Sequence, residues 1–485
     1  MNHRMIRYIL GWILIFECGF MLVPASTAVV YGEWRELFHF LATMLLCAAI
    51  GTLFIWKKPA NTTLYARDGF VTVALSWLVL SLFGAIPFFT TGCIDNYIDA
   101  LFEMVSGFTT TGSSVIASVE DMPYCINIWR CFSHWVGGMG VLVFIMAFVS
   151  LSGGQNMHIM KAESPGPSVG KLVPRVRTTA MILYSIYLAM TLILFVLLLF
   201  GDMNPYEALC TSFGTAGTGG FGFRNDSLAS FSPYVQIVVT VFMLLFSVNF
   251  SCYYLLLLRR FKDAFNVELR RFVIIVVIAI GLITWNVFSA VGVTASFGET
   301  LRQVAFTVAS IISTTGYTVT NYDLWPTLAR TLIVGITFIG ACAGSTGGGF
   351  KVSRLYIVVR GALNELGNLI HPHRVKKVLM DGRPVENDVV RTANVYLAWY
   401  VLLFAVSVIL LSFDPNITTD PLTTNFSAVA TTFNNVGPGL GQVGPAGNFA
   451  CYNWFSTLVL TFDMLIGRLE LFPVLALLSP STWKK

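Results

Sequence analysis

Long apolar segments alternate with short polar stretches along the whole of this 485-residue chain. A segment of about 20 apolar residues can cross a bilayer as a helix, and the pattern predicts about ten such spans. We therefore expect an all-α polytopic membrane protein. The predicted spans lie near residues 9–30, 37–56, 69–90, 127–151, 178–200, 233–258, 271–292, 327–359, 393–413 and 452–478.

A second pattern recurs four times between these spans, roughly a hundred residues apart. An apolar segment of roughly a dozen residues, too short to cross a bilayer, runs into a polar stretch that ends at a glycine. The glycines are Gly112, Gly219, Gly316 and Gly437. Each unit is expected to consist of a span, a re-entrant pore helix, a descending loop and a second span. Capping residues precede three of the short segments, at Asn204-Pro205, Gly298-Glu299 and Asp420-Pro421.

Four units in register predict a pseudo-fourfold arrangement in which the loops line one passage. Non-helical backbone is tolerated at membrane depth only where protein buries it or water lines it. Glycine lacks a Cβ and reaches positive φ, so its neighbours' carbonyl oxygens can turn inward and replace the hydration shell of a cation. For one copy, an ordinary turn is the simpler interpretation, and four copies in register argue against it. The predicted ion filter comprises Thr110, Thr111, Gly112, Thr218, Gly219, Gly220, Thr314, Thr315, Gly316, Asn435, Val436 and Gly437.

The residues around these glycines favour potassium as the ion. No acidic residue adjoins them, and a neutral carbonyl cage suits a large, weakly hydrated monovalent cation. Potassium channels carry a second glycine two positions further on, whereas counting from the four glycines gives Ser114, Phe221, Thr318 and Gly439. We therefore expect modest discrimination between potassium and sodium. The expected potassium contacts are Thr111, Gly112, Thr218, Gly219, Thr315, Gly316, Val436 and Gly437.

A glycine-rich stretch and one arginine form a candidate gate. Residues 340–351 read GACAGSTGGGFK, and each glycine lowers helix stability by about 1 kcal/mol relative to alanine. A helix break is expected there, leaving a loop that crosses beneath the filter as a plug. The alternative is a small-residue helix-packing face. Arg468 lies in the last apolar span and needs partners, either carbonyls of this loop or Glu470. The candidate gate residues are Gly344, Ser345, Thr346, Gly347, Gly348, Gly349, Lys351 and Arg468.

Composition and charge agree with a membrane protein. The chain is 55% hydrophobic and 11% charged. Basic residues such as Lys57, Lys58 and Arg259 fall in one set of loops, and acids such as Asp202 in the other, which predicts cytoplasmic termini. The first span begins like a signal peptide, but we expect it to remain uncleaved.

Other function classes find less support in the sequence. A membrane-embedded enzyme needs catalytic groups within its spans. Of six histidines, His134 lies inside a predicted span and His39 only near the start of another, so no enzyme is expected. His371 and His373 are a possible metal pair, although a solvated pair in a basic loop is the simpler interpretation. That basic loop could contact a regulatory partner or anionic lipid. An ion-coupled secondary transporter stays open as the alternative. Nucleic-acid binding is not expected, because no aromatic and basic residues are interleaved on a soluble surface.

Several motifs together resemble those of a known family. The chain contains TTTGSS, TAGTGGFG, STTGYT and NNVGPG, followed by ACAGSTGGGFKVSR and MLIGRLELFP in the gate region. These resemble the Trk/Ktr superfamily of potassium transporters, in particular its TrkH-type membrane subunits. The resemblance implies a homodimer in a bacterial inner membrane, one pore per subunit, and a cytosolic nucleotide-binding, TrkA-like regulatory partner. It also implies an extra N-terminal two-helix segment at 1–60, with repeats at 61–165, 166–265, 266–375 (including the gating loop) and 376–485.

Overall fold

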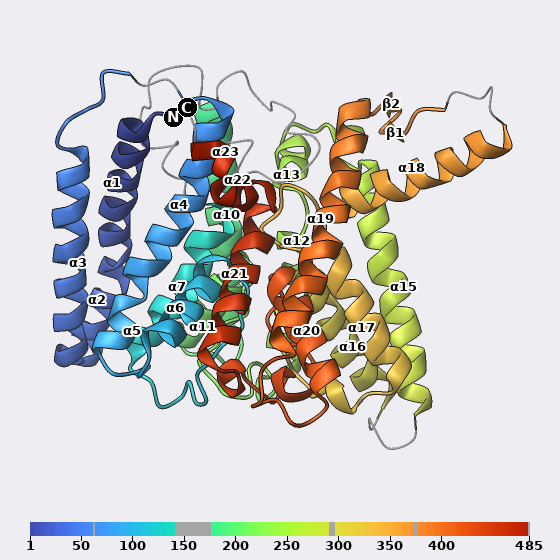
Figure 1. Cartoon of the computed structure of the whole chain (residues 1–485). Helices are drawn as coiled ribbons and strands as arrows, with labels where there is room; N and C mark the ends of the chain where they lie inside the picture. The colour runs from blue at the N-terminus through green and yellow to red at the C-terminus, as the bar shows by residue number, and fades with distance from the viewer. Residues whose placement is uncertain (62–63, 141–175, 291–295, 372–375, 484–485) are drawn as a thin grey trace.

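The computed structural model describes residues 1–61, 64–140, 176–290, 296–371 and 376–483. Within these ranges the fold is all-α apart from one short hairpin, β1 (Leu379–Met380) and β2 (Arg383–Pro384). Figure 1 shows most helices with their axes roughly aligned. The start of α1 and the terminal helix α23 (Pro480–Trp483) lie at the same end of the molecule. The predicted fold class is thus confirmed at the level of a helical protein with several long apolar helices.

Six described helical segments are long and apolar enough to cross a membrane. The first combines α1 (His3–Phe20) and α2 (Leu22–Tyr31), and the second is α3 (Trp34–Ile55). The third combines α4 (Ala66–Gly84) with α5 (Ile86–Thr90). The other three are α10 (Val176–Leu199), α15 (Val267–Ser289) and α19 (Asn387–Leu411).

Three predicted spans prove to be broken helices. The span predicted at 233–258 divides into α12 (Pro233–Phe246) and α13 (Phe250–Leu257), which are bent by 90°. The one at 452–478 divides into α21 (Trp454–Leu469) and α22 (Phe472–Leu478), because Glu470 and Leu471 have φ of 60° and 61°. The one at 327–359 divides, as predicted, into α17 (Thr327–Ile339) and α18 (Val352–Ile370).

The predicted span at 127–151 is described in part, as α7 (Tyr124–Gly138). Its remainder and the repeat boundary predicted at 165 and 166 lie outside the described residues. The short elements complete the described fold and connect the longer helices. They are α14 (Phe261–Ala264), η1 (Tyr322–Leu324), η2 (Gly441–Val443) and η3 (Phe449–Cys451).

The four predicted short segments are helices α6 (Tyr97–Phe108), α11 (Pro205–Gly217), α16 (Phe297–Ile312) and α20 (Pro421–Phe433). The side chain of Asn204 caps α11 in a capping box with Glu207, as the sequence suggests. The cap of α16 is Ser296, two residues before the predicted Gly298. Asp420 is the N-cap of α20, but its side chain makes no capping hydrogen bond, since its backbone is left-handed with φ of 45°. Asn96 caps α6.

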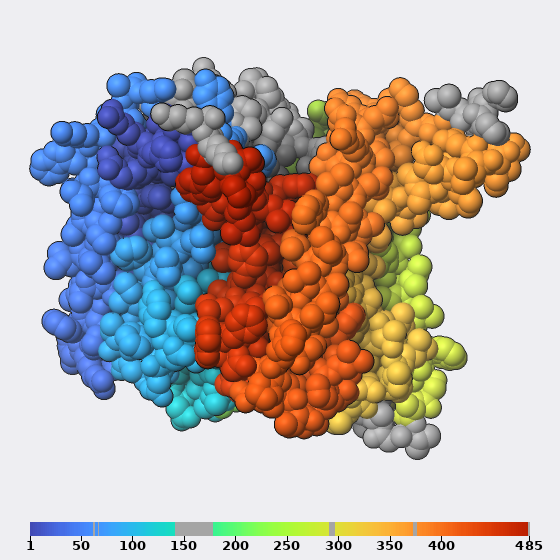
Figure 2. All heavy atoms as spheres, viewed as in Figure 1, coloured from blue at the N-terminus to red at the C-terminus, as the bar shows by residue number. Residues whose placement is uncertain are grey.

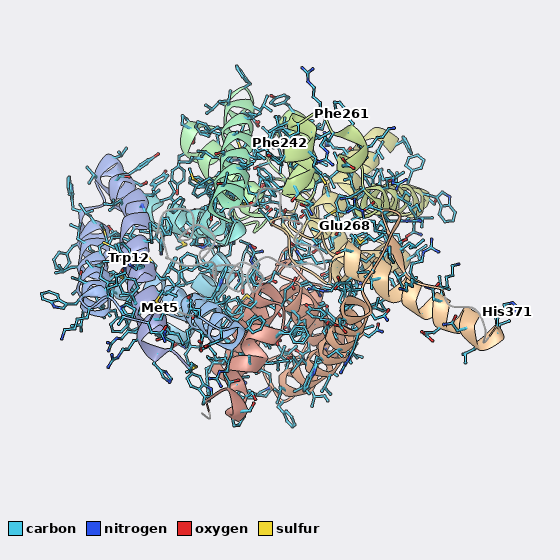
Figure 3. The ribbon with its side chains drawn as sticks, turned by 90° about the horizontal axis from the view of Figure 1, so that it is seen from above. Met5, Trp12, Phe242, Phe261, Glu268 and His371 are labelled. Carbon is cyan, nitrogen blue, oxygen red and sulfur yellow. The ribbon has the colours of Figure 1, made fainter. Side chains whose placement is uncertain are left out.

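The chain winds around the centre of the molecule in sequence order. Seen from above, the colours pass from blue and cyan through green and yellow to red (Figure 3). Helices α1 and α3 lie at one outer edge, where Met5 and Trp12 are labelled, and α18 projects outward to His371 (Figure 3). In the space-filling view the other described helices pack into one continuous body (Figure 2). The C-terminal halves of the four short helices are buried inside that body.

Candidate functional site

All four short helices end in the same hydrogen-bonded cap. The N–H groups of Thr110, Thr218, Thr314 and Asn435 donate to the carbonyl three residues earlier at 3.1 to 3.2 Å. The N–H of the next residue donates to the carbonyl five residues earlier at 2.8 to 2.9 Å. These two bonds define a Schellman cap, which requires a left-handed residue. We call residues 110–112, 218–220, 314–316 and 435–437 the four glycine segments.

The caps correct the predicted register of the second glycine segment. Gly220, with φ of 80°, aligns with Gly112, Gly316 and Gly437, which have φ of 82°, 85° and 103°. The prediction had aligned Gly219 instead, because the sequence contains two consecutive glycines and only the helix end distinguishes them. This new alignment also changes the residue two positions beyond the aligned glycine of the second unit, which is Gly222 rather than Phe221.

The shift also changes which threonines can offer hydroxyl groups beside the glycines. Thr218 aligns with Thr110 rather than Thr111, and its hydroxyl donates to Gly217 O at 2.6 Å. The residues that precede the aligned glycines are Thr111, Gly219, Thr315 and Val436. Hydroxyl groups are therefore present at that position in the first and third segments only.

The four glycine segments meet one another in a closed order. A Cβ built on Gly112 would lie less than 3.0 Å from the carbonyl oxygen of Gly219. A Cβ on Gly220 would also lie less than 3.0 Å from Thr315 O, one on Gly316 from Val436 O, and one on Gly437 from Thr111 O. Each segment thus packs its glycine against the carbonyl oxygen of the next, and the fourth returns to the first. Only backbone fits at these four positions.

Three of the residues just before this ring are threonines in the left-handed conformation. Thr110, Thr218 and Thr314 have φ of 55°, 55° and 60°. β-Branched residues rarely adopt positive φ, and such strain of about 1–3 kcal/mol per residue is concentrated at functional sites. Composition alone could not reveal it, because it depends on where each helix ends.

Side chains that the sequence analysis did not select hold neighbouring segments together. His134 is fully buried, and its Nδ1 lies 2.7 Å from Gly107 O while its Nε2 accepts from Phe221 N at 3.1 Å. The second bond assigns the proton to Nδ1, so this histidine bridges the first and second units as a neutral ring. The hydroxyl of Tyr317 donates to Phe221 O at 3.2 Å, which links the third unit to the second.

Asn435 joins the fourth glycine segment to the first. Its Nδ2 donates to Thr111 Oγ1 at 3.0 Å and to Met464 O at 2.9 Å. We expect Asn435→Ala to lower the free energy of unfolding by about 2 kcal/mol, since it removes hydrogen bonds and forces alanine into a left-handed backbone. Thermal unfolding in detergent measures this. The control is Asn364→Ala on the projecting helix α18, whose amide makes one 3.4 Å contact and whose loss should leave the melting temperature unchanged.

A vestibule opens on one side of the ring. All four aligned glycines line it, together with residues that follow them, and its volume is about 260 Å³. Serine, asparagine and glycine supply much of its wall, as in Ser113, Asn225 and Asn448. The vestibule gives water and ions a polar approach to the carbonyl oxygens.

The candidate gating loop lies on the opposite side of the ring. Residues 340–351 are not helical, so the alternative of a continuous helix-packing face is wrong. A Cβ on Gly347 would lie 2.8 Å from Ser313 O, and one on Gly348 would lie 2.6 Å from Asn434 O. Gly348 N also donates to Thr314 Oγ1 at 2.6 Å. The loop therefore packs against the ends of α16 and α20.

Hydrogen bonds fix the rest of the loop. Thr346 donates its hydroxyl to Phe246 O at 3.1 Å, at the break between α12 and α13. Ala343 N donates to Glu268 Oε1 at 2.7 Å, at the start of α15. Lys351 is buried and its Nζ donates to Gly347 O. Hydrogen bonds to α12, to α15 and within the loop therefore define the position of the loop in this structure.

The guanidinium of Arg468 donates hydrogen bonds to backbone carbonyl groups of this loop and of α7. Its Nη1 donates to Thr346 O at 2.8 Å, and its Nη2 donates to Gly137 O at 2.6 Å and to Gly138 O at 3.0 Å. Glu470, the alternative partner, instead forms an ion pair with Arg354. A partly open cavity of about 90 Å³ lies beside Arg468, and its lining includes Gly344, Ser345, Gly347, Gly348 and Lys351. The predicted contact between Arg468 and the loop is confirmed for one carbonyl group, that of Thr346, and the other two carbonyl partners belong to α7.

The site offers neutral oxygen atoms rather than metal-binding side chains. Within the described ranges, no group of three or more histidine, cysteine, aspartate or glutamate residues could hold a metal ion. His371 is described, but His373 lies outside the described residues. The arrangement suits weak, reversible contacts to a monovalent cation.

Comparison with known proteins adds an independent result. The family model TrkH, described as "Cation transport protein", matches residues 36–485. The chain is 33% identical to the Trk system potassium uptake protein TrkH of Escherichia coli K12 and 34% identical to that of Vibrio parahaemolyticus, covering 100% of each chain. It is 30% identical to TrkG of Escherichia coli K12, with 99% of both chains covered. The crystal structure of the potassium transporter TrkH from Vibrio parahaemolyticus superposes with a TM-score of 0.89 at 32% identity over 100% of both chains.

Proposed function

This chain belongs to the TrkH family of cation transport proteins, and we propose that it conducts potassium ions through a gated, channel-like pore. The observation that carries the proposal is the closed order in which the four glycine segments meet. In this proposal the carbonyl oxygens of Thr111, Gly219, Thr315 and Val436, with those of the aligned glycines, form the filter. The corrected register replaces Thr218 by Gly220 among the potassium contacts.

The electrostatics of the site support a monovalent cation. Four helix C-termini converge on the filter, and each carries about half a negative charge. The carbonyl oxygens are neutral, so a potassium ion can exchange its hydration shell for them and still leave. Two positions beyond the aligned glycine, the second and fourth units have a further glycine, Gly222 and Gly439. The first and third units have Ser114 and Thr318 there. A short carbonyl stack with modest preference for potassium over sodium follows.

The loop at 340–351 is the proposed gate. It packs against the helix ends beneath the filter, and Arg468 holds it there while placing a positive charge in the pathway. Because the described helices contain no separate soluble domain, the signal for opening is proposed to come from outside this chain. We further propose that the chain forms a homodimer in a bacterial inner membrane, with lipid around the exposed helices. Its termini are cytoplasmic in this proposal, and its regulatory partner is a TrkA-like nucleotide-binding protein.

Purified protein in liposomes tests the proposal. Thallium has nearly the size of potassium, so we expect thallium entry well above that of protein-free vesicles, and competition by potassium more strongly than by sodium. A fluorescence assay of thallium influx measures both. Absence of thallium entry in vesicles with correctly folded protein would reject the pore.

Coupled transport is a second candidate, favoured by one buried carboxyl group. Asp463 in α21 is 1% exposed, and its Oδ1 accepts from Ser407 while Oδ2 has no partner among the described residues. An acid inside the membrane is typical of proton-coupled transporters. In the same liposomes, opposed potassium and proton gradients separate the two candidates. Uncoupled conduction gives a reversal potential set by potassium alone, whereas coupling shifts it with the proton gradient.

A further inference from the structure

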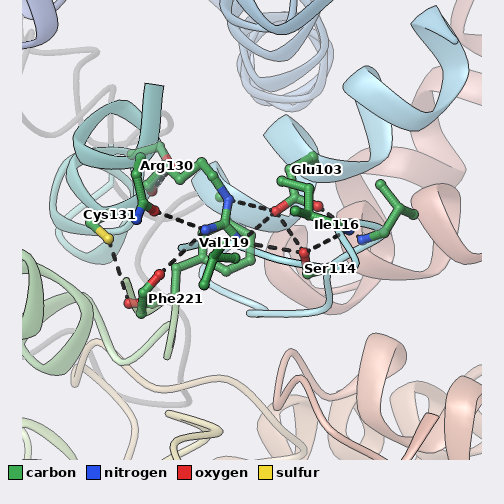
Figure 4. Close-up of polar contacts among 12 residues, drawn as sticks. Glu103, Ser114, Ile116, Val119, Arg130, Cys131 and Phe221 are labelled. Carbon is green, nitrogen blue, oxygen red and sulfur yellow. Dashed lines mark hydrogen bonds and ion pairs between the residues drawn. The ribbon is translucent and has the colours of Figure 1, made fainter. Parts of the chain in front are cut away.

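A buried ion pair lies beside the vestibule, and its arginine, Arg130, is one of the lining residues. Figure 4 shows the polar contacts of this pair. Glu103 in the pore helix α6 and Arg130 in α7 are 2.7 Å apart, from Oε1 to Nη2, and their side chains are 0% and 2% exposed. Removing two charges from water is so costly that replacing a buried pair by apolar residues is often neutral or stabilising. Its presence beside the glycine segments therefore needs an explanation other than stability.

The carboxylate of Glu103 holds the chain that follows the first glycine segment. Its Oε1 accepts from Arg130 Nε at 2.7 Å and from Ser114 Oγ at 3.0 Å. Its Oε2 accepts from Val115 N at 3.0 Å. Ser114 is two residues beyond Gly112, so the pair fixes the vestibule end of the first segment.

Arg130 reaches the second glycine segment as well. Its Nη1 donates to Gly222 O at 3.4 Å, and its guanidinium lies 4.2 Å from the ring centre of Phe221. Its Nη2 donates to Ser114 Oγ at 3.3 Å. One planar group thus contacts the residues two positions beyond the aligned glycines in both segments, and Asn127 Oδ1 fixes its orientation at 3.0 Å.

The other three pore helices have no acid at the position of Glu103. Alignment by the Schellman caps places Thr211, Thr307 and Ala428 there. Between the third and fourth units, the Tyr322 hydroxyl donates to Pro438 O at 3.3 Å instead. Among the four units, an ion pair at this position therefore links only the first and second glycine segments.

We propose that the Glu103–Arg130 pair determines the selectivity of the filter by fixing the separation of the first and second glycine segments. A carbonyl cage prefers potassium over the smaller sodium ion only while it resists contracting. In this proposal the ion binds carbonyl oxygens of the glycine segments, and the pair acts on those segments through Ser114, Val115 and Gly222, so both are positioning residues. The inference deepens the proposed function and rests on it.

The test compares Glu103→Gln with wild type in liposomes. The variant removes the negative charge and cannot accept all the hydrogen bonds of the carboxylate. We expect the modest potassium-to-sodium preference in competitive flux to be lost, because the loss of one hydrogen bond to a charged group is enough to offset it, while thallium entry continues. Ser114→Ala keeps the pair and the bond from Val115 N but removes the two hydrogen bonds of Ser114 Oγ to Glu103 and Arg130, so it should lower the preference by less.

The control is Glu207→Gln, which breaks another ion pair of a pore helix. Glu207 Oε1 lies 3.0 Å from Arg224 Nη2, and the two side chains are 13% and 34% exposed. The potassium-to-sodium preference of Glu207→Gln should equal that of wild type. An unchanged preference in Glu103→Gln overturns the inference, even if thermal stability and flux fall together. If Glu103→Gln yields no folded protein, the potassium-to-sodium preference of Ser114→Ala is compared with wild type instead, and an unchanged preference then overturns the inference. Failure of wild type itself to conduct thallium would instead reject the proposed function.

Discussion

Replacing Gly316 by alanine is expected to abolish cation flux, with a loss of at least about a hundredfold. Gly316 has φ of 85°, and a Cβ there would overlap Val436 O and lie 2.9 Å from Pro438 Cδ. Val436 O is a backbone atom of the neighbouring glycine segment, and Pro438 follows that segment directly, so neither atom is the end of a flexible side chain that could move aside. The substitution must therefore displace the carbonyl oxygen that is proposed to contact the ion. Thallium influx into liposomes measures the effect.

A matched glycine in the same unit provides the control. Gly298 lies in the first turn of α16, and a Cβ there meets no atom within 4 Å. Gly298→Ala should conduct like wild type and remain as stable. Substantial thallium entry through folded Gly316→Ala would contradict the proposed filter, because the ring has no other space for a side chain.

The sequence predicted the elements of the site better than their register. The four short helices and the glycines that end them follow from the length of the apolar segments and the position of the polar stretches. The choice between Gly219 and Gly220 did not follow, since it depends on which residue becomes left-handed at the end of α11. In the structure that residue is Thr218, and the next glycine with positive φ is Gly220.

Contacts between units were also beyond reach of the sequence. The helix break at 340–351 was predictable from glycine content, but its partners are residues such as Thr314 and Glu268, far away in the chain. Arg468 was recognisable because a charge inside an apolar span needs partners. Glu103 and Arg130 met the same criterion and were missed, since their spacing matches no local helix pattern.

Removing the guanidinium of Arg468 is expected to raise basal flux by about tenfold or more. Arg468→Met loses the hydrogen bonds to Thr346 O, Gly137 O and Gly138 O, so the closed position of the loop loses its anchor. Methionine also removes a positive charge from the proposed cation pathway. Basal thallium influx measures the change in the absence of any partner protein.

Two further variants separate the anchor from the charge. Arg468→Lys keeps the charge but cannot bind Thr346 O and the α7 carbonyls with one planar group. High flux in this variant indicates that the anchor closes the pore, and wild-type flux indicates that the charge does. Shortening residues 344–349 should raise flux in either case, because the loop can then no longer cover the ends of α16 and α20. Arg259→Met, at an exposed position after α13, is the control. Unchanged flux in both Arg468→Met and the shortened loop would exclude this loop as the gate.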